Sequence, residues 1–291
     1  MTTAPTSAAF PAMPTPLVSA QQLSTALRGG LAPAIIDCSF DLADTAAGQR
    51  AFANGHLPGA HYAHLDRDLA GPKTGRNGRH PLPARADWAA TLARFGVAPE
   101  RHVVVYDAQG GMYAARAWWM LLWAGHRAVS VLDGGLQAWK DAGGAIESGE
   151  GAGPAAEVPY PLGHSLVKTV DADALQQSLG RVTLLDARAG ERFRGEVEPL
   201  DARAGHIPGA RSRFFKDNLD STGRFRPVAE LRAAFEAFGA EPGSVVHQCG
   251  SGVTACHNLL AMEAAGLAGS TLYPGSWSEW SSDPARPIAV G

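Results

Sequence analysis

The second half of this 291-residue chain repeats the first, and this repetition limits the folds open to it. The clearest repeated element is Gly55-His-Leu-Pro-Gly-Ala60, which returns as Gly205-His-Ile-Pro-Gly-Ala210. Three further pairs of segments keep the same order in both halves: 35–37 with 184–186, 103–107 with 245–249, and 132–139 with 273–280. These ordered matches predict two copies of one structural unit joined in tandem.

Each copy alternates short apolar runs with helical stretches. In the first copy we expect strands at 34–37, 103–106 and 129–132, and helices near 85–95, 113–124 and 136–141. Strands that alternate with helices are typical of a parallel sheet covered by helices on both faces. The predicted fold class is therefore α/β, with two similar domains of this kind.

Composition divides the chain into four parts. Residues 1–15 contain no Lys or Arg and no sustained apolar core, so we expect a disordered tail and neither a signal nor a transit peptide. A stretch rich in Gly, Ala, Glu and Pro predicts a linker at 146–166. The two domains would then cover 16–145 and 167–291.

The composition favours small-molecule chemistry. A net charge of −3 with scattered basic residues offers no surface for nucleic acid or an acidic membrane. The most apolar run, Ala117–Ala124, is far too short to span a membrane. Three cysteines without metal-ligand spacing argue against a disulfide framework and for a reducing compartment such as the cytoplasm. Histidines gather at 56–64, but the second copy of that turn keeps only His206, so no metal site is expected.

One cysteine opens a glycine-rich turn between a strand and a helix. Val245-Val246 signals the strand, the cysteine loop follows as Cys249-Gly-Ser-Gly-Val-Thr254, and an apolar helical run begins at Asn258. Glycines at 250 and 252 allow several backbone N–H groups to converge, and the positive end of the helix lies beside them. Both effects favour a thiolate: a pKa near 8.5 leaves a thiol about 3% ionised at pH 7, whereas roughly 6 makes it about 90% ionised. Because ligands bind outside the carboxyl ends of parallel strands, Cys249 is the candidate nucleophile.

Other interpretations of the cysteine loop fit less well. A phosphatase loop needs an arginine six positions after the cysteine, and position 255 is Ala. The glycines match a dinucleotide-binding fingerprint in letters, but no acidic residue ends a second strand about 20 residues later. A cysteine that only packs in the core is not expected between the end of a strand and a Gly-Ser-Gly turn. The equivalent residue in the first copy is Asp107, so we expect only the second half to be catalytic.

Together these features resemble the tandem rhodanese family: two similar domains, a Gly-His-x-Pro-Gly-Ala element in each, and a cysteine-headed loop only in the second. The resemblance implies a ping-pong reaction in which Cys249 takes a sulfur from a small donor, becomes a persulfide and passes the sulfur on. The implied acceptor is a thiol, such as thioredoxin or glutathione, or cyanide, and neither a metal nor an organic cofactor is implied. The amides that would hold the sulfur anions are those of Gly250, Ser251, Gly252, Val253 and Thr254.

Within the family, this loop resembles that of members that use 3-mercaptopyruvate, whereas thiosulfate-specific members carry basic residues just after the cysteine. The resemblance implies that Ser251 relays a proton to the departing pyruvate enolate, although a serine here is also an ordinary turn former. It assigns the donor carboxylate to Arg192. A second family arginine is missing: its place falls near Leu200 or Asp201, and Arg203 is the available substitute. Thiosulfate therefore stays open as the donor, and so does a slow persulfide-carrying regulatory module.

Overall fold

The computed structural model describes residues 16–151 and 158–291, so the tail expected at 1–15 lies outside the described residues. The first domain contains, in chain order, β1 (Leu17–Val18), α1 (Ala20–Arg28), β2 (Ala34–Asp37), α2 (Ala47–Asn54), β3 (Ala60–Tyr62), α3 (Leu65–Asp68), α4 (Arg85–Arg94), β4 (Val103–Tyr106), α5 (Ala114–Trp123), β5 (Val129–Leu132) and α6 (Gly135–Asp141). The second contains β6 (Lys168–Thr169), α7 (Ala172–Ser178), β7 (Thr183–Asp186), α8 (Gly190–Phe193), β8 (Arg211–Ser212), the 3₁₀ helix η1 (Phe215–Asn218), α9 (Val228–Glu236), the 3₁₀ helix η2 (Pro242–Ser244), β9 (Val245–Gln248), α10 (Thr254–Ala264), β10 (Thr271–Leu272) and α11 (Ser276–Trp280).

The two halves have the same sheet. The strand orders are β1-β5-β4-β2-β3 and β6-β10-β9-β7-β8, and neighbouring strands are parallel throughout. Position by position, these orders superimpose β4 on β9 and β2 on β7. The duplication seen in the sequence is therefore a duplication of the fold, and the predicted α/β class is confirmed.

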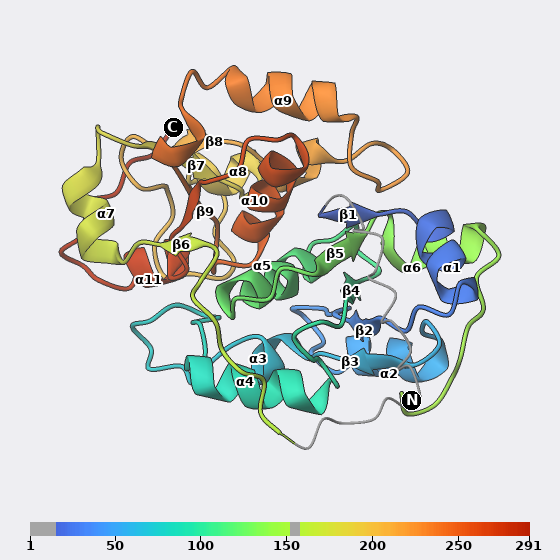
Figure 1. Ribbon diagram of the computed structural model, residues 1–291. Coiled ribbons are helices and arrows are strands. Elements are labelled where there is room, and N and C mark those ends of the chain that lie inside the picture. Colours follow the sequence, from blue (N-terminus) through green and yellow to red (C-terminus); the bar gives the residue numbers. More distant parts are fainter. Residues whose placement is uncertain (1–15, 152–157) are drawn as a thin grey trace.

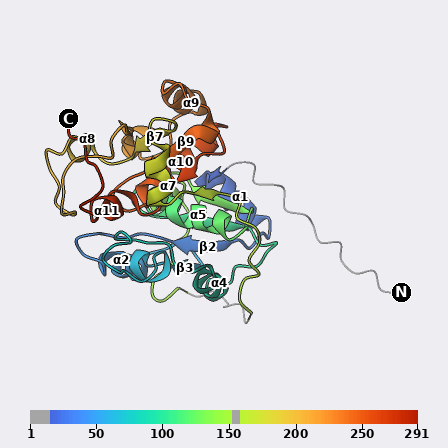
Figure 2. The ribbon, with the colours of Figure 1, turned by 90° about the vertical axis from the view of Figure 1, so that its left-hand side faces the viewer.

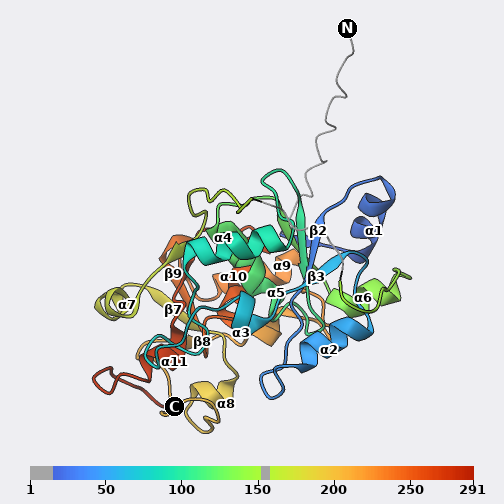
Figure 3. The same ribbon diagram turned by 90° about the horizontal axis from the view of Figure 1, so that it is seen from below.

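The strands are apolar on both faces because helices cover both. In the first sheet, Ile36 and Val105 belong to the core that α3, α4 and α5 close, whereas the alternating Ile35 and Val104 belong to the core that α1, α2 and α6 close. Each of these four side chains is at most 3% exposed. Figure 3 shows α1, α2 and α6 together on one side of the strands. Burial on both faces is typical of parallel sheets between helices.

The two domains share part of their core. Trp119 on α5 and Leu260 on α10 belong to one continuous buried cluster, and both are 0% exposed. Figures 1 and 2 show α5 and α10 lying between the two sheets. His257 on α10 places its Nε2 3.0 Å from the carbonyl oxygen of Gly110, in the loop after β4. The loop after β4 therefore contacts α10 at the domain interface.

The repeated histidine of the Gly-His-x-Pro-Gly-Ala element has the same packing in both domains. His56 stacks on Phe52 with ring centroids 3.8 Å apart, and His206 stacks on Phe193 at 3.9 Å. Each ring also places Nδ1 within 2.8 Å of the carbonyl oxygen of the phenylalanine that it stacks on. These contacts account for the histidines as turn-forming residues. Within the described ranges, no group of three or more His, Cys, Asp or Glu side chains could hold a metal ion.

The described parts of the expected linker lie along the first domain. Glu147 pairs with His56 through two backbone hydrogen bonds of 2.9 Å, and the amide of Gly149 donates to Ala53 at 2.7 Å. Further on, the amide of Gly163 donates to the carbonyl after α5 at 2.9 Å. The start of the expected linker is therefore held against the repeated turn and α2.

The expected elements of the first half are present, each within one residue of its predicted bounds. The helix after the cysteine loop begins at Thr254 and not near Asn258. Ala255 and Cys256 are buried on this helix, so no amphipathic pattern marks its start. No helix of the described residues is long and apolar enough to cross a membrane. The early start of α10 brings the first turn of the helix into the cysteine loop.

Acid is expected to destabilise the fold because histidines are buried uncharged. Burial lowers the pKa of His247 to about 3 and that of His257 to about 4. Between about pH 6.5 and these values the unfolded chain binds protons that the folded chain does not, so the free energy of unfolding falls by about 1.4 kcal/mol per pH unit for each histidine. Urea unfolding of the wild type and of His247→Gln from pH 7 to 4 measures this. The plot of unfolding free energy against pH should be steeper for the wild type than for His247→Gln, by the slope that one bound proton contributes. Parallel plots would contradict the conclusion that His247 is buried in its uncharged form.

Candidate active site

Cys249 is the first residue after β9, at the carboxyl end of the central strand of the second sheet. The start of α11 fixes its backbone: the Cys249 amide donates to Ser276 Oγ at 3.1 Å, and its carbonyl accepts from the Trp277 amide at 2.9 Å. Ser276 has φ +55°, a left-handed conformation that is uncommon outside glycine. A residue held in such a conformation is typical of a place where the surroundings dictate backbone geometry.

The cysteine loop leaves its main-chain N–H groups without protein partners. Within the part of the chain that the structure describes, the amides of residues 250–254 donate to no acceptor. Gly252 has φ +77°, and a Cβ there would lie 2.2 Å from the carbonyl oxygen of Pro274, so only glycine fits. Gly250, by contrast, has no positive φ. A Cβ at this position would meet Arg79 at 2.9 Å and Arg192 at 3.3 Å. A glycine is therefore needed at 250 because the two guanidinium groups approach the backbone closely, and not because of an unusual backbone conformation.

The first domain shows how such a loop binds an anion. Asp107 follows β4 as Cys249 follows β9. The Asp107 carboxylate accepts hydrogen bonds of 2.8 to 2.9 Å from four amides of its own loop and helix start, those of Gln109, Gly111, Tyr113 and Ala114. In the second domain the same backbone frame carries a shorter side chain that ends in sulfur. Its amides are therefore available to a thiolate, or to an anion attached to it.

A cavity of about 280 Å³ opens over the cysteine loop, and both domains line it. This volume is near the lower end of the range for small-molecule sites. Cys249 is 1% exposed and lies in the wall. The other expected loop residues in the wall are Gly250, Ser251, Val253 and Thr254, whereas Gly252 is turned against Pro274. Apolar side chains complete it, among them Leu65, Met112 and Tyr113 of the first domain and Phe214 and Phe215 of the second.

Ser251 contacts a histidine of the first domain. Its Oγ lies 2.7 Å from Nδ1 of His80, and Nε2 of His80 lies 3.5 Å from Oδ1 of Asp66. Burial lowers the pKa of His80 to about 3, although Asp66 opposes this shift. His80 is therefore neutral near pH 7. With its N–H directed at Asp66, the imidazole can accept a proton from the Ser251 hydroxyl.

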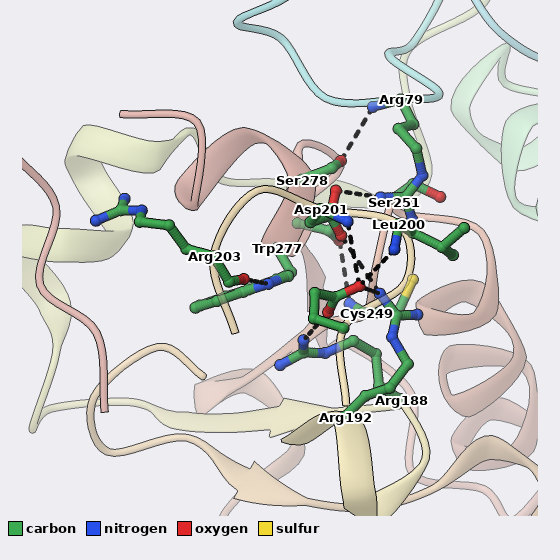
Figure 4. A network of polar contacts seen from close by, with 12 residues as sticks. Arg79, Arg188, Arg192, Leu200, Asp201, Arg203, Cys249, Ser251, Trp277 and Ser278 are labelled. Atoms are coloured by element: carbon green, nitrogen blue, oxygen red, sulfur yellow. Dashed lines mark hydrogen bonds and ion pairs between the residues drawn. The ribbon is translucent and has the colours of Figure 1, made fainter. Parts of the chain in front are cut away.

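Two arginines reach the cysteine loop, one from each domain (Figure 4). Arg192 and Arg79 both line the cavity beside Gly250. Both also bind Asp201: Arg79 Nη1 contacts Oδ1, and Arg192 Nη2 lies 3.3 Å from Oδ2. Arg192 donates in addition to Glu198 at 2.6 Å. The resemblance pointed to Arg192, whereas Arg79 and His80 lie in an irregular loop of the other domain that carried no motif.

Arg203 does not reach the cavity, contrary to the expectation that it replaces the missing arginine. Its guanidinium donates to four main-chain carbonyls near the end of the chain, those of Trp280, Ser281, Asp283 and Arg286. Figure 4 shows the side chain directed away from Cys249. Arg203 therefore fastens the C-terminal segment, and Arg79 is the second cation beside the loop.

Arg116 on α5 ties the cysteine loop to the first domain. Its side chain is 0% exposed, and it donates to the carbonyl of Gly252 at 3.0 Å and to that of His80 at 3.1 Å. No carboxylate of the described residues pairs with it. One buried guanidinium thus holds the loop with the thiol and the loop with the histidine in register.

Known proteins share this architecture. A Pseudomonas aeruginosa protein named "Probable 3-mercaptopyruvate sulfurtransferase" is 48% identical over 94% of this chain and 98% of its own. The thiosulfate sulfurtransferase of Gallus gallus is 33% identical, over 91% of this chain and 92% of its own. The solved structure of 3-mercaptopyruvate sulfurtransferase from Leishmania major matches with a TM-score of 0.81 at 31% identity, over 92% of this chain and 74% of that one.

The family model of the rhodanese-like domain matches the chain twice, at residues 19–142 and 171–283. The first range contains α1 to α6 with β2 to β5, and the second contains α7 to α11 with β7 to β10. Each range therefore holds one helix-covered sheet, and the second also holds the cysteine loop. The chain belongs to the rhodanese family, as a tandem of two rhodanese-like domains.

Proposed function

We propose that this chain is a sulfurtransferase that moves a sulfane sulfur from 3-mercaptopyruvate to a thiol or to cyanide through a persulfide on Cys249. The observation that carries the proposal is that one cavity is lined by a thiol on a loop with unpaired amides and by the two arginines that border Gly250, Arg79 and Arg192. Unpaired amides suit an anionic sulfur, and guanidinium groups suit a carboxylate. 3-Mercaptopyruvate carries a thiol at one end and a carboxylate at the other.

In the first half-reaction the Cys249 thiolate attacks the donor sulfur, and the donor C–S bond breaks. The electron pair of that bond goes to the departing pyruvate enolate, and the proton of the donor thiol ends on the enolate carbon. The products are pyruvate and an anionic persulfide on Cys249, so charge is conserved. The amides of residues 250–254 stabilise this anion as amides stabilise an oxyanion.

Ser251 and His80 offer a path for the proton. Neutral His80 accepts the proton of the donor thiol through the Ser251 hydroxyl and returns it to the enolate by the same route. Asp66, beside Nε2, stabilises the positive charge that the imidazole carries between the two transfers. Because burial lowers the pKa of His80 to about 3, the imidazole is uncharged at neutral pH and would hold the proton only between the two transfers.

In the second half-reaction an acceptor attacks the outer sulfur, and the Cys249 thiolate leaves. A thiol such as that of glutathione or thioredoxin becomes a persulfide, and cyanide becomes thiocyanate. Neither half-reaction uses a metal or an organic cofactor. A reducing compartment such as the cytoplasm suits this step because acceptor thiols stay reduced there.

Thiosulfate is the second candidate donor, because a relative named for it is 33% identical and because the two arginines also suit its anionic oxygens. The two proposals are tested by kcat/KM for each donor with one acceptor. We expect the value for 3-mercaptopyruvate to be the higher one, since no cation stands within the loop itself. A higher value for thiosulfate would reassign the donor, and negligible turnover with both would leave only a persulfide-carrying module.

Removing the proton path is expected to affect the two donors unequally. Ser251→Ala or His80→Gln should lower kcat/KM for 3-mercaptopyruvate at least about tenfold, toward the 10²-fold and more that proton transfer typically contributes. Turnover of thiosulfate should fall less, because sulfite departs without a proton. Steady-state kinetics with both donors measures this, and thiosulfate serves as the internal control. An equal loss with both donors would mean that the pair only shapes the loop.

A further inference from the structure

The carboxylate of Asp201 pairs with the two arginines that the proposed function assigns to the donor carboxylate. It bridges Arg79 and Arg192, the two cations that border Gly250, and its side chain is 6% exposed. Leu200, the residue before it, lines the cavity over Cys249. An acidic side chain of the protein therefore already occupies the guanidinium groups that a donor needs.

The charges of the ion-pair cluster around Asp201 are balanced among its own members. Three guanidinium groups and three carboxylates make up the arginine–carboxylate cluster: Arg79, Arg188, Arg192, Asp186, Glu198 and Asp201. A donor carboxylate added to this cluster would be a fourth anion facing its three cations. Lys216 also lines the cavity, but its side chain is exposed to solvent and is not a member of the cluster. Such an excess charge is costly unless one of the protein's own carboxylates withdraws.

Asp201 is the carboxylate that can withdraw. Asp186 is 0% exposed and is held by Arg188 and by a backbone amide, and Glu198 accepts from two arginines and from the amides of residues 200 and 201. Within the described residues, the Asp201 carboxylate contacts only the two guanidinium groups. It stands on an irregular segment between α8 and β8, where Val197 and Leu200 are 50% and 44% exposed.

We propose that Asp201 is a built-in competitor for the carboxylate site, which a ligand must displace to bridge Arg79 and Arg192. Asp201 then sets specificity: neutral reagents of the same size reach Cys249 without displacing it, whereas carboxylates must exchange with it. The exchange weakens carboxylate binding and keeps the two arginines paired when no ligand is bound. This inference rests on the proposed role of the arginines, but not on the identity of the sulfur donor.

Alkylation of Cys249 tests the proposal without sulfur transfer. Iodoacetate and iodoacetamide have the same size and leaving group and differ in one negative charge; in both reactions the thiolate displaces iodide. The ratio of their rate constants, followed by intact mass, should rise at least about fivefold in Asp201→Asn, as the loss of one charge-assisted competitor implies. Asp217→Asn is the matched control, because Asp217 is 63% exposed and pairs with Arg213 outside the cavity. Its ratio should equal that of the wild type.

A second arm uses pyruvate as a non-reacting carboxylate that protects Cys249 from iodoacetamide. The pyruvate concentration that gives half-maximal protection should be lower in Asp201→Asn than in the wild type. This difference should disappear when Arg192→Ala is added. An unchanged or lower ratio in folded Asp201→Asn would overturn the proposal, because Asp201 would then be irrelevant to binding or would position the arginines. If the protein does not turn over 3-mercaptopyruvate but the ratio of rate constants rises in Asp201→Asn, the proposed donor is wrong and the proposed role of Asp201 is supported.

Discussion

Cys249→Ser is expected to reduce sulfur transfer to background with every donor. A serine hydroxyl is not ionised near pH 7 and cannot form a persulfide, so both half-reactions lose their nucleophile. Pyruvate release from 3-mercaptopyruvate and thiocyanate formation from thiosulfate and cyanide measure the two donors separately. Substantial turnover by this variant would contradict the mechanism.

The other cysteines serve as controls. Cys256→Ser and Cys38→Ser should keep most of the activity, because both thiols are 0% exposed and outside the cavity wall. Burial raises the pKa of Cys256 to about 12, and it raises that of Cys38 as well. Exposure to the donor without an acceptor should add one sulfur atom that maps to Cys249. Sulfur mapped to Cys38 would mean that the cysteine loop is not the reactive site.

Arg192→Ala is expected to lower kcat/KM for 3-mercaptopyruvate by about 2–4 kcal/mol in transition-state free energy, the usual cost of a charge-assisted contact in a partly dehydrated site. The side chain is 17% exposed and lies beside Gly250, so it is not a free surface charge. Arg192→Lys should restore little, because an ammonium group cannot make a two-pronged contact with a carboxylate. Steady-state kinetics of both variants measures this.

Arg203→Ala is the matched control for Arg192→Ala. Its guanidinium fastens main-chain carbonyls near the C-terminus, so its loss should lower the melting temperature and leave KM unchanged. Equal kcat/KM for Arg192→Ala and the wild type would return Arg192 to a structural role. A large rise of KM in Arg203→Ala would show that Arg203 binds the donor carboxylate, as its position in the sequence first indicated.

Much of the fold could be predicted because the central strands carry a strong local signal. Val103-Val-Val-Tyr106 is buried on both faces, so it forms a continuous apolar run that a parallel sheet requires. The outer strands carry no such signal: Leu17–Val18 and Arg211–Ser212 have two residues each, too few for any periodicity. Their places in the sheet are set by pairing with neighbours and not by local pattern.

The candidate site could be predicted only where it is local in sequence. Cys249 and Ser251 share one loop, and Arg192 lies in a recognisable motif of the same domain. The contacts of His80 with Ser251 and of Arg79 with Asp201 span 171 and 122 residues and cross the domain interface. Arg203 failed as a substitute because its sequence position is near the site while its side chain turns to the chain end. Proximity in sequence says little about which face of an irregular segment an arginine occupies.

The carboxylate that closes the first-domain loop is covalently tethered, and this gives the two copies different dependence on their solvent. A tethered anion has a very high effective concentration, so dissolved anions cannot displace Asp107 from its four amides. The corresponding amides of the second domain must take water or whatever anion is present. Anions should therefore rigidify only the second copy, and hydrogen exchange at residues 250–254 should slow with added anion while exchange at 109–114 stays constant. Duplication has thus yielded one loop whose anion is part of the chain and one whose amides take their anion from solution.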